Sequence, residues 1–170
     1  ENRRLFWGSV LWHYGIVLIL GIHIVAFLVP GLWGALTANR TLLYVIEVIG
    51  LALALVTIVA MVLLLARRVS VDRVRAVTTT SDWVLLFVLF VQVVLGFWVA
   101  FFYRWGSDWF LHTAQPWLVS LLTLQPQIEF VSALPAPVQW HMLWGFVIIA
   151  IFPFTRLVHV VTYPITYLWR

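Results

Sequence analysis

Four long apolar stretches run along this chain and are separated by short clusters of polar residues. They cover approximately residues 5–29, 41–66, 81–103 and 137–162. A helix needs about 20 apolar residues to cross the hydrocarbon core of a bilayer, and each stretch is long enough. Lipid offers no hydrogen-bond partner to an open strand edge, so all four are predicted to be helices. The pattern predicts an all-α membrane protein, an up-down transmembrane helix bundle of four spans in one domain, residues 1–170.

Proline and polar residues mark the ends of these spans. Pro30-Gly31 is expected to stop the first span, and Ser81-Asp82 is a good N-cap pair for the third. Pro153 lies inside the fourth span and is expected to kink it. The long connection before that span contains residues 116–124 (PWLVSLLTL), which are predicted to form a short helix in the membrane interface.

The composition excludes several classes of protein and site. The chain is 64% hydrophobic and only 9% charged, whereas a soluble domain is about half apolar and a quarter charged. Cysteine is absent, which excludes disulfides, iron–sulfur clusters and thiolate metal sites in this chain. The basic residues are all arginine and lie in short clusters beside apolar stretches. That pattern is typical of membrane topology and not of nucleic-acid binding, so no nucleic-acid partner is expected.

The arginines also predict the orientation of the bundle. On one side of an up-down arrangement lie Arg3, Arg4, Arg67, Arg68, Arg73, Arg75 and Arg170, and on the other lie Arg40 and Arg104. Because cytoplasmic ends of spans carry an excess of positive residues, both termini and the loop over residues 67–80 are predicted to be cytoplasmic.

Four of the five histidines lie within or beside the first and last spans: His13, His23, His141 and His159. Ionisable side chains at membrane depth are costly, and neutral imidazole is a natural axial ligand of haem iron. The alternative is that they are core histidines hydrogen-bonded to neighbouring helices, but two on each of two antiparallel helices favour ligation. His112 lies in the outer loop and is interpreted as an ordinary interfacial residue.

The histidine spacing predicts how the four would pair. On an ideal helix, ten residues from His13 to His23 rise about 15 Å, and eighteen from His141 to His159 rise about 27 Å and return to the same face. In antiparallel helices, His13 then meets His159 on the cytoplasmic side and His23 meets His141 on the outer side. The difference in rise must be absorbed by helix tilt and by the kink at Pro153.

Several segments resemble the gamma, cytochrome b subunit of respiratory nitrate reductase. The most specific is FPFTRLVHVVTYPITYLWR (Phe152–Arg170), which is similar to the family's C-terminal signature. Similar segments are WHYGIVLILGIH in the first span, RVRAVTTTSDW (Arg73–Trp83) and PWLVSLLTLQPQIE (Pro116–Glu129). The likeness covers nearly the whole chain.

The resemblance implies a family with five spans, two b haems and a quinol site on the outer side. His13, His23, His141 and His159 match the ligand positions, in the pairing given above. Implied partners are an iron–sulfur subunit and a molybdenum catalytic subunit on the cytoplasmic face. The implied function is to oxidise quinol, either menaquinol or ubiquinol, and pass electrons to that nitrate reductase, in the cytoplasmic membrane of a prokaryote. The chain starts at Glu1 and has four spans, so the family's first span is expected to be missing from it.

The resemblance also bears on quinol binding and on the haem propionates. The family has a quinol-contacting lysine near the outer end of the helix after the first histidine pair, and this chain has no lysine. The quinol-site candidates are His23, Arg40 and Glu47. Glu47 is expected to accept a quinol proton or to bond to Arg40, and the alternative is that it packs against another polar group. Arg156 and Arg75 are candidates for binding haem propionates, and the alternative for Arg156 is an arginine that snorkels to the interface.

Two alternatives remain open at this point. One is the cytochrome b subunit of a related complex: sulfite-reductase-associated, chlorate-type, or running in reverse from nitrite. The other is a haem-free membrane anchor or small transporter, against which the paired histidines argue. Gln92 in the third span is interpreted as a residue that hydrogen-bonds between helices, and Asp82 as a helix-start residue.

Overall fold

The computed structural model describes residues 2–158, with side chains from Trp7 onward, and that part of the chain is helical without strands. Four long helices form the bundle: α1 (Asn2–Leu28), α3 (Arg40–Ser70), α5 (Thr80–Phe102) and α9 (Ala136–Ile151). Each is long and apolar enough to cross a membrane, the last together with the turn that ends at Phe154. The predicted all-α bundle of four spans is therefore confirmed.

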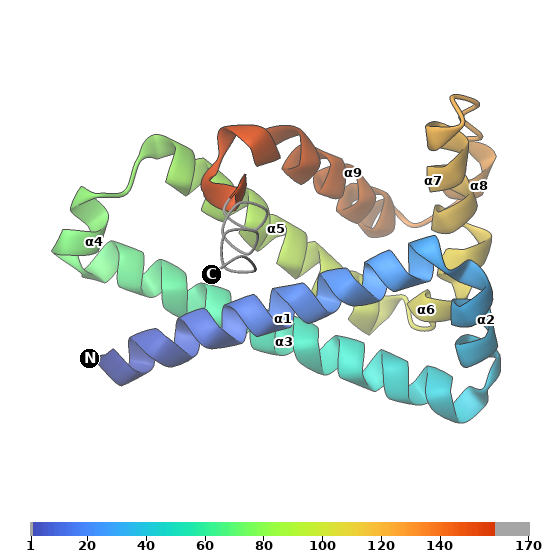
Figure 1. Cartoon of the computed structure of the whole chain (residues 1–170), viewed down its shortest axis with the longest axis horizontal. Coiled ribbons are helices and arrows are strands. Elements are labelled where there is room, and N and C mark those ends of the chain that lie inside the picture. Colours follow the sequence, from blue (N-terminus) through green and yellow to red (C-terminus); the bar gives the residue numbers. More distant parts are fainter. Residues whose placement is uncertain (1, 159–170) are drawn as a thin grey trace, which may run out of the picture.

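Short helices connect the spans. They are α2 (Pro30–Ala38), α4 (Asp72–Ala76), α6 (Gly106–Trp109), α7 (Ala114–Leu122), α8 (Glu129–Ser132) and the 3-10 helices η1 (Phe110–His112), η2 (Phe152–Phe154) and η3 (Arg156–Val158). Figure 1 shows α2, α6, α7 and α8 gathered at one end of the bundle and α4 at the opposite end. The short helix expected at residues 116–124 is confirmed as α7, which starts two residues earlier.

The first span stops where the sequence predicts, because α1 ends at Leu28 and Val29 is not helical. Pro30 then opens α2, in the first helical turn, where the missing N–H of proline removes no intrahelical bond. One helix start differs from the prediction. The third span is capped by Thr79 rather than by Ser81-Asp82. The Thr79 hydroxyl accepts the main-chain N–H of Asp82, and the Asp82 carboxylate accepts the main-chain N–H of Thr79, which forms a capping box.

The last span ends earlier than predicted. A kinked helix was expected to continue to residue 162, but α9 ends at Ile151 and the chain continues through η2 and η3. Pro153 is the physical reason, because it has no N–H to donate to the carbonyl four residues earlier and its ring crowds that carbonyl. Residues 159–162 of the predicted span lie outside the described residues.

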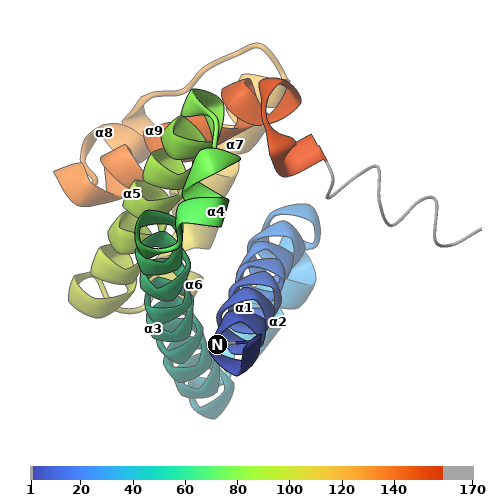
Figure 2. The ribbon, with the colours of Figure 1, turned by 90° about the vertical axis from the view of Figure 1, so that its left-hand side faces the viewer.

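The helices pack in the order of the chain: α1 on α3, α3 on α5, and α5 on α9. Figure 2 shows α1 beside α3 and α5 beside α9. The interior of the bundle lies along α3, where Thr57, Ala60 and Met61 are fully buried. Gly15 of α1 permits this packing, because a methyl group there would lie 2.5 Å from the Thr57 Oγ1 atom. Small residues that let helices approach closely are typical of membrane bundles.

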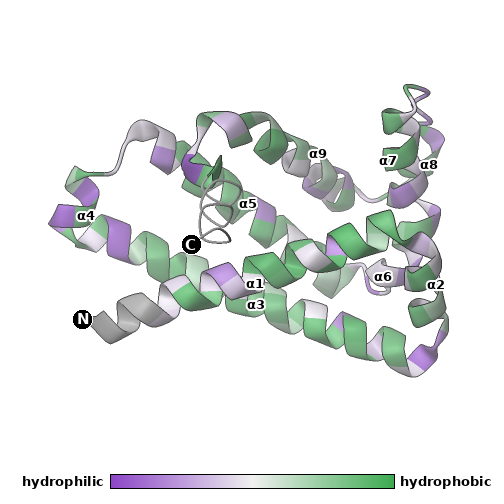
Figure 3. Cartoon of the chain, viewed as in Figure 1, coloured by the Kyte–Doolittle hydropathy of each residue, from purple (hydrophilic) through white to green (hydrophobic). Residues whose placement is uncertain are grey.

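The outer surface of the bundle is apolar over most of its length. Figure 3 shows hydrophobic residues along the four long helices and hydrophilic residues mainly towards their ends and in the connections. Val17 and Val48, for example, are 60% and 64% exposed. An aqueous protein surface rarely carries apolar patches of this extent. Lipid contact explains them, and the protein is a multi-pass membrane protein.

Candidate functional site

His23 on α1 and His141 on α9 lie close together across the bundle. Their ring centroids are 6.5 Å apart and their ring planes are inclined by 56°. These are the two histidines that the antiparallel arrangement predicts to meet at the outer end. The structure therefore brings one of the two expected histidine pairs together from opposite ends of the sequence.

The separation of these two rings fits an iron atom held from both sides. A bond of about 2 Å from metal to imidazole nitrogen, with about 1 Å more to the ring centre, places two axial imidazoles about 6 Å apart. The observed 6.5 Å agrees with this spacing. The angle between the ring planes is compatible with a shared iron atom, since axial imidazoles can rotate about the metal–nitrogen bond. The donor set is also suitable, because neutral imidazoles are ordinary axial ligands of haem iron.

The histidines of α1 are held in one tautomer by their own helix. Nδ1 of His23 lies 2.8 Å from the main-chain oxygen of Ile19, and Nδ1 of His13 lies 2.8 Å from that of Ser9. A carbonyl oxygen only accepts hydrogen bonds, so Nδ1 must carry the proton and Nε2 the lone pair. Metal-binding histidines commonly donate their second ring nitrogen in this way, which fixes the ring and strengthens the ligand. No pattern in the sequence predicts these two hydrogen bonds.

Of the second expected pair, His13 and His159, the structure describes only His13. His13 lies on α1 ten residues before His23, with its ring anchored as above. His159 lies outside the described residues, so the pairing of His13 with His159 stays a prediction. The end of α9 at Ile151 also means that His141 and His159 are not joined by one straight helix. The argument that eighteen residues return to the same helical face therefore does not apply.

His141 is set into the α5–α9 interface by a reciprocal pattern of small and polar residues. A methyl group at Gly96 of α5 would lie 3.0 Å from Cε1 of His141, and one at Gly145 of α9 would lie 3.7 Å from Nε2 of Gln92. Gln92 and Gly96 are one turn apart on α5, and His141 and Gly145 are one turn apart on α9. Each helix thus presents a glycine to the polar side chain of the other. Gln92 lies in this interface, but the hydrogen bond between helices expected from the sequence stays a prediction, because its Oε1 atom has no partner among the described residues.

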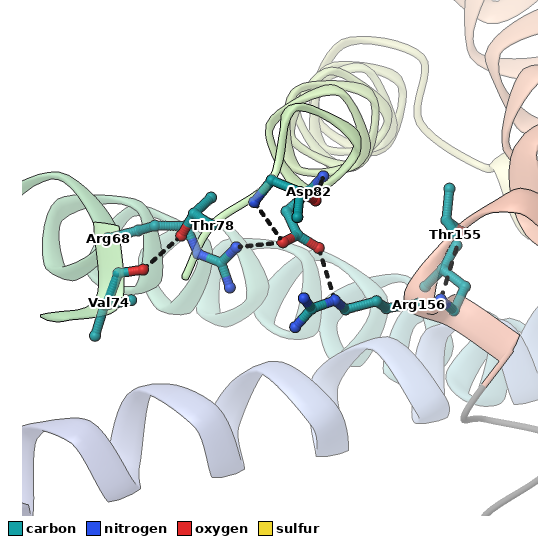
Figure 4. Close-up of polar contacts among 8 residues, drawn as sticks. Arg68, Val74, Thr78, Asp82, Thr155 and Arg156 are labelled. Carbon is teal, nitrogen blue, oxygen red and sulfur yellow. Dashed lines mark hydrogen bonds and ion pairs between the residues drawn. The ribbon is translucent and has the colours of Figure 1, made fainter. Parts of the chain in front are cut away.

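The two arginines proposed to bind propionates both bind aspartates. Arg156 Nε lies 3.1 Å from Asp82 Oδ1, and Arg68 Nη1 lies 3.8 Å from Asp82 Oδ2. Figure 4 shows Asp82 between the two arginines, one from α3 and one from the segment after α9. Arg75 binds Asp72 at 2.8 Å on the exposed surface of α4. Asp82 is therefore more than a helix-start residue, because its buried carboxylate joins three elements.

Glu47 binds the outer connection. Its carboxylate accepts the main-chain N–H of Trp105 at 3.1 Å and that of Ser107 at 2.9 Å. Trp33 of α2 donates its indole N–H to the Ser107 carbonyl at 2.8 Å. Trp105 has a left-handed backbone conformation, with φ of 66°, which a non-glycine residue adopts only when neighbouring contacts hold it. Glu47 and Trp33 supply such contacts, and the Glu47 carboxylate binds these amides rather than Arg40.

Arg40, the basic candidate for the quinol site, lies at the first residue of α3 and is exposed. Its guanidinium carbon is 5.9 Å from the ring centre of Tyr44, and the Tyr44 ring meets the Trp105 ring edge to face at 4.9 Å. Arg40 is thus connected through Tyr44 to the same outer connection that Glu47 binds. The sequence did not reveal this aromatic contact, because the two rings come from distant segments.

Among the residues that the structure describes, no three histidine, aspartate or glutamate side chains cluster in a manner suited to a metal ion. The histidine pair is therefore the candidate for a metal-containing group on the described part of the chain. A haem needs only two axial ligands from protein, because its ring supplies the other four nitrogens.

Comparison with known proteins adds independent information. The chain matches the family described as "Nitrate reductase gamma subunit" over residues 1–170. It is 29% identical to the nitrate reductase gamma chain of Bacillus subtilis, covering 100% of this chain and 78% of that protein. It is 31% identical to the respiratory nitrate reductase 2 gamma chain of Escherichia coli, covering 100% and 76%. It is also 30% identical to the nitrate reductase-like protein NarX of Mycobacterium tuberculosis, of which it spans 27%.

Proposed function

We propose that this chain carries two b haems and conducts electrons from quinol to partner subunits. The premise is that it belongs to the nitrate reductase gamma subunit family. As a gamma subunit, it is a membrane component of an oxidoreductase complex with catalytic partners. In the proposal, quinol is oxidised at the outer side. The electrons leave on the cytoplasmic side to an iron–sulfur subunit and then to a molybdenum subunit.

The contact between His23 and His141 is the observation that carries this proposal. Two imidazoles 6.5 Å apart between antiparallel helices have the spacing that one iron requires. His23 presents Nε2 as the lone-pair nitrogen, because its Nδ1 hydrogen bonds to Ile19. A core histidine that only forms hydrogen bonds needs no second histidine beside it. It also needs no glycine in close contact with its ring, as Gly96 is with His141. A haem-free anchor accounts less well for the arrangement.

The chain's own residues would hold the haems and leave no axial position open. Bound haem supplies iron that accepts and releases one electron at a time. His23 with His141, and His13 with His159, would provide the axial nitrogens. Iron with both axial positions filled by protein binds no substrate, so these pairs serve conduction. His13 and His23 are exposed on the described chain, so in the proposal the bound haem and the lipid cover them. Burial and nearby charge then influence the reduction potential.

The proposed orientation follows the arginine distribution. Residues 67–75 contain Arg67, Arg68, Arg73 and Arg75 at one end of the bundle, whereas Arg40 and Arg104 lie at the other. By the positive-inside rule, we propose that the first end faces the cytoplasm, the side that the sequence predicts for both termini. The partner subunits would then dock at the end that carries α4, and quinol would bind at the end that carries α2 and α6.

The quinol site is proposed at the outer ends of α1 and α3, near His23, with Arg40 in place of the family's lysine. Arginine remains charged and donates several hydrogen bonds, but it does not readily release a proton. Glu47 is the proton acceptor in this proposal. A carboxylate has about four lone-pair positions, and the two main-chain bonds of Glu47 leave capacity for a third partner.

The test is to replace His13 and His23 separately with alanine in the full complex and to measure the haem extracted per complex. Each variant should contain about one haem in place of two, because loss of one axial ligand releases the haem that it held. His112→Ala is the matched control, since His112 is exposed in the outer connection. Two haems retained in both the His13 and His23 variants would disprove the ligand assignment.

A further inference from the structure

Two buried side-chain polar atoms lack a hydrogen-bond partner within residues 7–158, and both lie between α5 and α9. They are Oε1 of Gln92 and Nδ1 of His141. Buried polar atoms in native proteins are nearly always paired, so each exception requires a physical explanation. His23 differs in this respect, because its Nδ1 atom is hydrogen-bonded to the main-chain oxygen of Ile19 in its own helix.

The neighbourhood of His141 shows which residue can supply that partner. The imidazole touches α5 at Gly96, and Gln92 lies one turn away on the same face of α5. The imidazole of His141 also lies near the main chain of Gln92, but its Nδ1 atom has no hydrogen-bond partner there. Nδ1 of His141 makes no hydrogen bond to a carbonyl of its own helix, in contrast to Nδ1 of His23. The amide oxygen of Gln92 is the other unpaired buried atom in this interface.

We propose that Gln92 is a positioning residue for His141, and that its amide oxygen accepts a hydrogen bond from the Nδ1–H of the imidazole. This inference rests on the proposed function, in which Nε2 of His141 is a haem ligand. The bond pairs both orphan atoms at once and fixes the tautomer that leaves the Nε2 lone pair available. The two ligands of the outer centre are then anchored differently: His23 by its own helix and His141 by a side chain of α5.

This difference has an electronic consequence that can be measured. A hydrogen bond from Nδ1–H makes the imidazole a stronger donor to iron, which favours the ferric state. Removal of the acceptor in Gln92→Leu should raise the reduction potential of the outer haem. A full negative charge in Gln92→Glu should lower it. The decisive shift is the one in Gln92→Leu, because the negative charge of Gln92→Glu lowers the potential of a nearby haem with or without the hydrogen bond.

The experiment is a redox titration of the full complex, followed by the optical and EPR signals of its haems. At the wild-type midpoint potential of the outer haem, we expect the ferric-to-ferrous ratio to fall about tenfold in Gln92→Leu. That ratio corresponds to about 59 mV for a one-electron couple. In Gln92→Glu we expect the ratio to rise. Gln125→Leu is the control, because Gln125 is exposed in the outer connection.

The possible outcomes separate this inference from the proposed function. If wild-type complex contains no haem, the proposed function fails and this inference fails with it. If wild-type complex contains two haems and Gln92→Leu titrates like Gln125→Leu, only the inference is overturned. Should Gln92→Leu fail to assemble, Gln92→Met, which also removes the amide oxygen, decides in its place. A raised potential for the outer haem supports the hydrogen bond, and an unchanged or lowered potential refutes it.

Discussion

Gly96 of α5 lies directly against the imidazole of His141 on α9. A methyl group at this glycine would meet Cε1 of the ring at 3.0 Å and each ring nitrogen at 3.6 Å. Contacts of 3.0 Å are closer than carbon atoms normally approach without one of them moving. The absence of a side chain at position 96 is therefore what allows His141 to sit where its ring is 6.5 Å from that of His23.

Gly96→Ala should displace the His141 ring by a few tenths of an ångström and weaken retention of the outer haem. Loss of correct support for a metal ligand typically reduces affinity about 10–100-fold. The measurement is the haem content of the purified complex after dilution into haem-free buffer. Gly50→Ala is the matched control, because a methyl group at Gly50 meets nothing within 4 Å. Equal haem retention in the two variants would show that the close contact is unimportant.

Gly15→Ala should loosen the packing of α1 on α3. The new methyl group would lie 2.5 Å from the Thr57 Oγ1 atom, and overpacking of this kind costs about 1–3 kcal/mol. The double variant Gly15→Ala, Thr57→Ala removes the obstructing oxygen and should recover most of that loss. Thermal unfolding in detergent is the measurement. If the double variant is no more stable than the single one, the cause of the destabilisation lies elsewhere.

Asp82→Asn should destabilise the bundle, because it removes the charge that holds Arg68 and Arg156 together. The carboxylate is buried but the Arg156 side chain is mostly exposed, so we expect a loss of about 1–2 kcal/mol, between the values for surface and buried pairs. Asparagine still accepts a hydrogen bond and so retains part of the helix cap. Asp72→Asn breaks the exposed pair with Arg75 and should change unfolding by less than about 0.5 kcal/mol. A similar change in both variants would contradict the structural role of Asp82.

Arg40→Ala should slow quinol oxidation while reduction of the haems by small dyes stays normal. The proposed basis is that Arg40 takes the place of the family's quinol-contacting lysine at the outer end of α3. The assay compares quinol-dependent and dye-dependent nitrate reduction, with an expected decrease of about tenfold in the first only, as for the loss of one charged hydrogen bond. Arg104→Ala controls for the loss of an outer positive charge. Normal turnover with quinol would exclude Arg40 from the site.

The sequence predicted the bundle well because lipid leaves few choices. A long apolar stretch must be a helix, and its length sets the span, so all four spans were found within a few residues of their observed starts. The main error occurred at a proline, because Pro153 ends α9 rather than bending it. Whether a proline kinks a helix or ends it depends on the residues that surround it in space.

The site was predictable only where two histidines share a helix. The spacing of His13 and His23 and the antiparallel order were enough to expect His23 beside His141. The supporting contacts were not predictable, because each joins residues distant in sequence: Gly96 with His141, and Glu47 with the main chain of the outer connection. No periodic pattern records which face of α5 meets α9. Glu47 illustrates the limit, since a lone acidic residue in a span indicates a partner without identifying it.

The order of packing bears on how the protein could be assembled. Since α1 adheres to α3, α3 to α5 and α5 to α9, the four spans form a row whose two outermost members are brought together by the histidine pair. In such a row, each new span can pack on a span that has already been inserted as it leaves the translocation machinery. Under the proposed function, the tetrapyrrole would then enter last, sideways from the bilayer, and close the row into a ring.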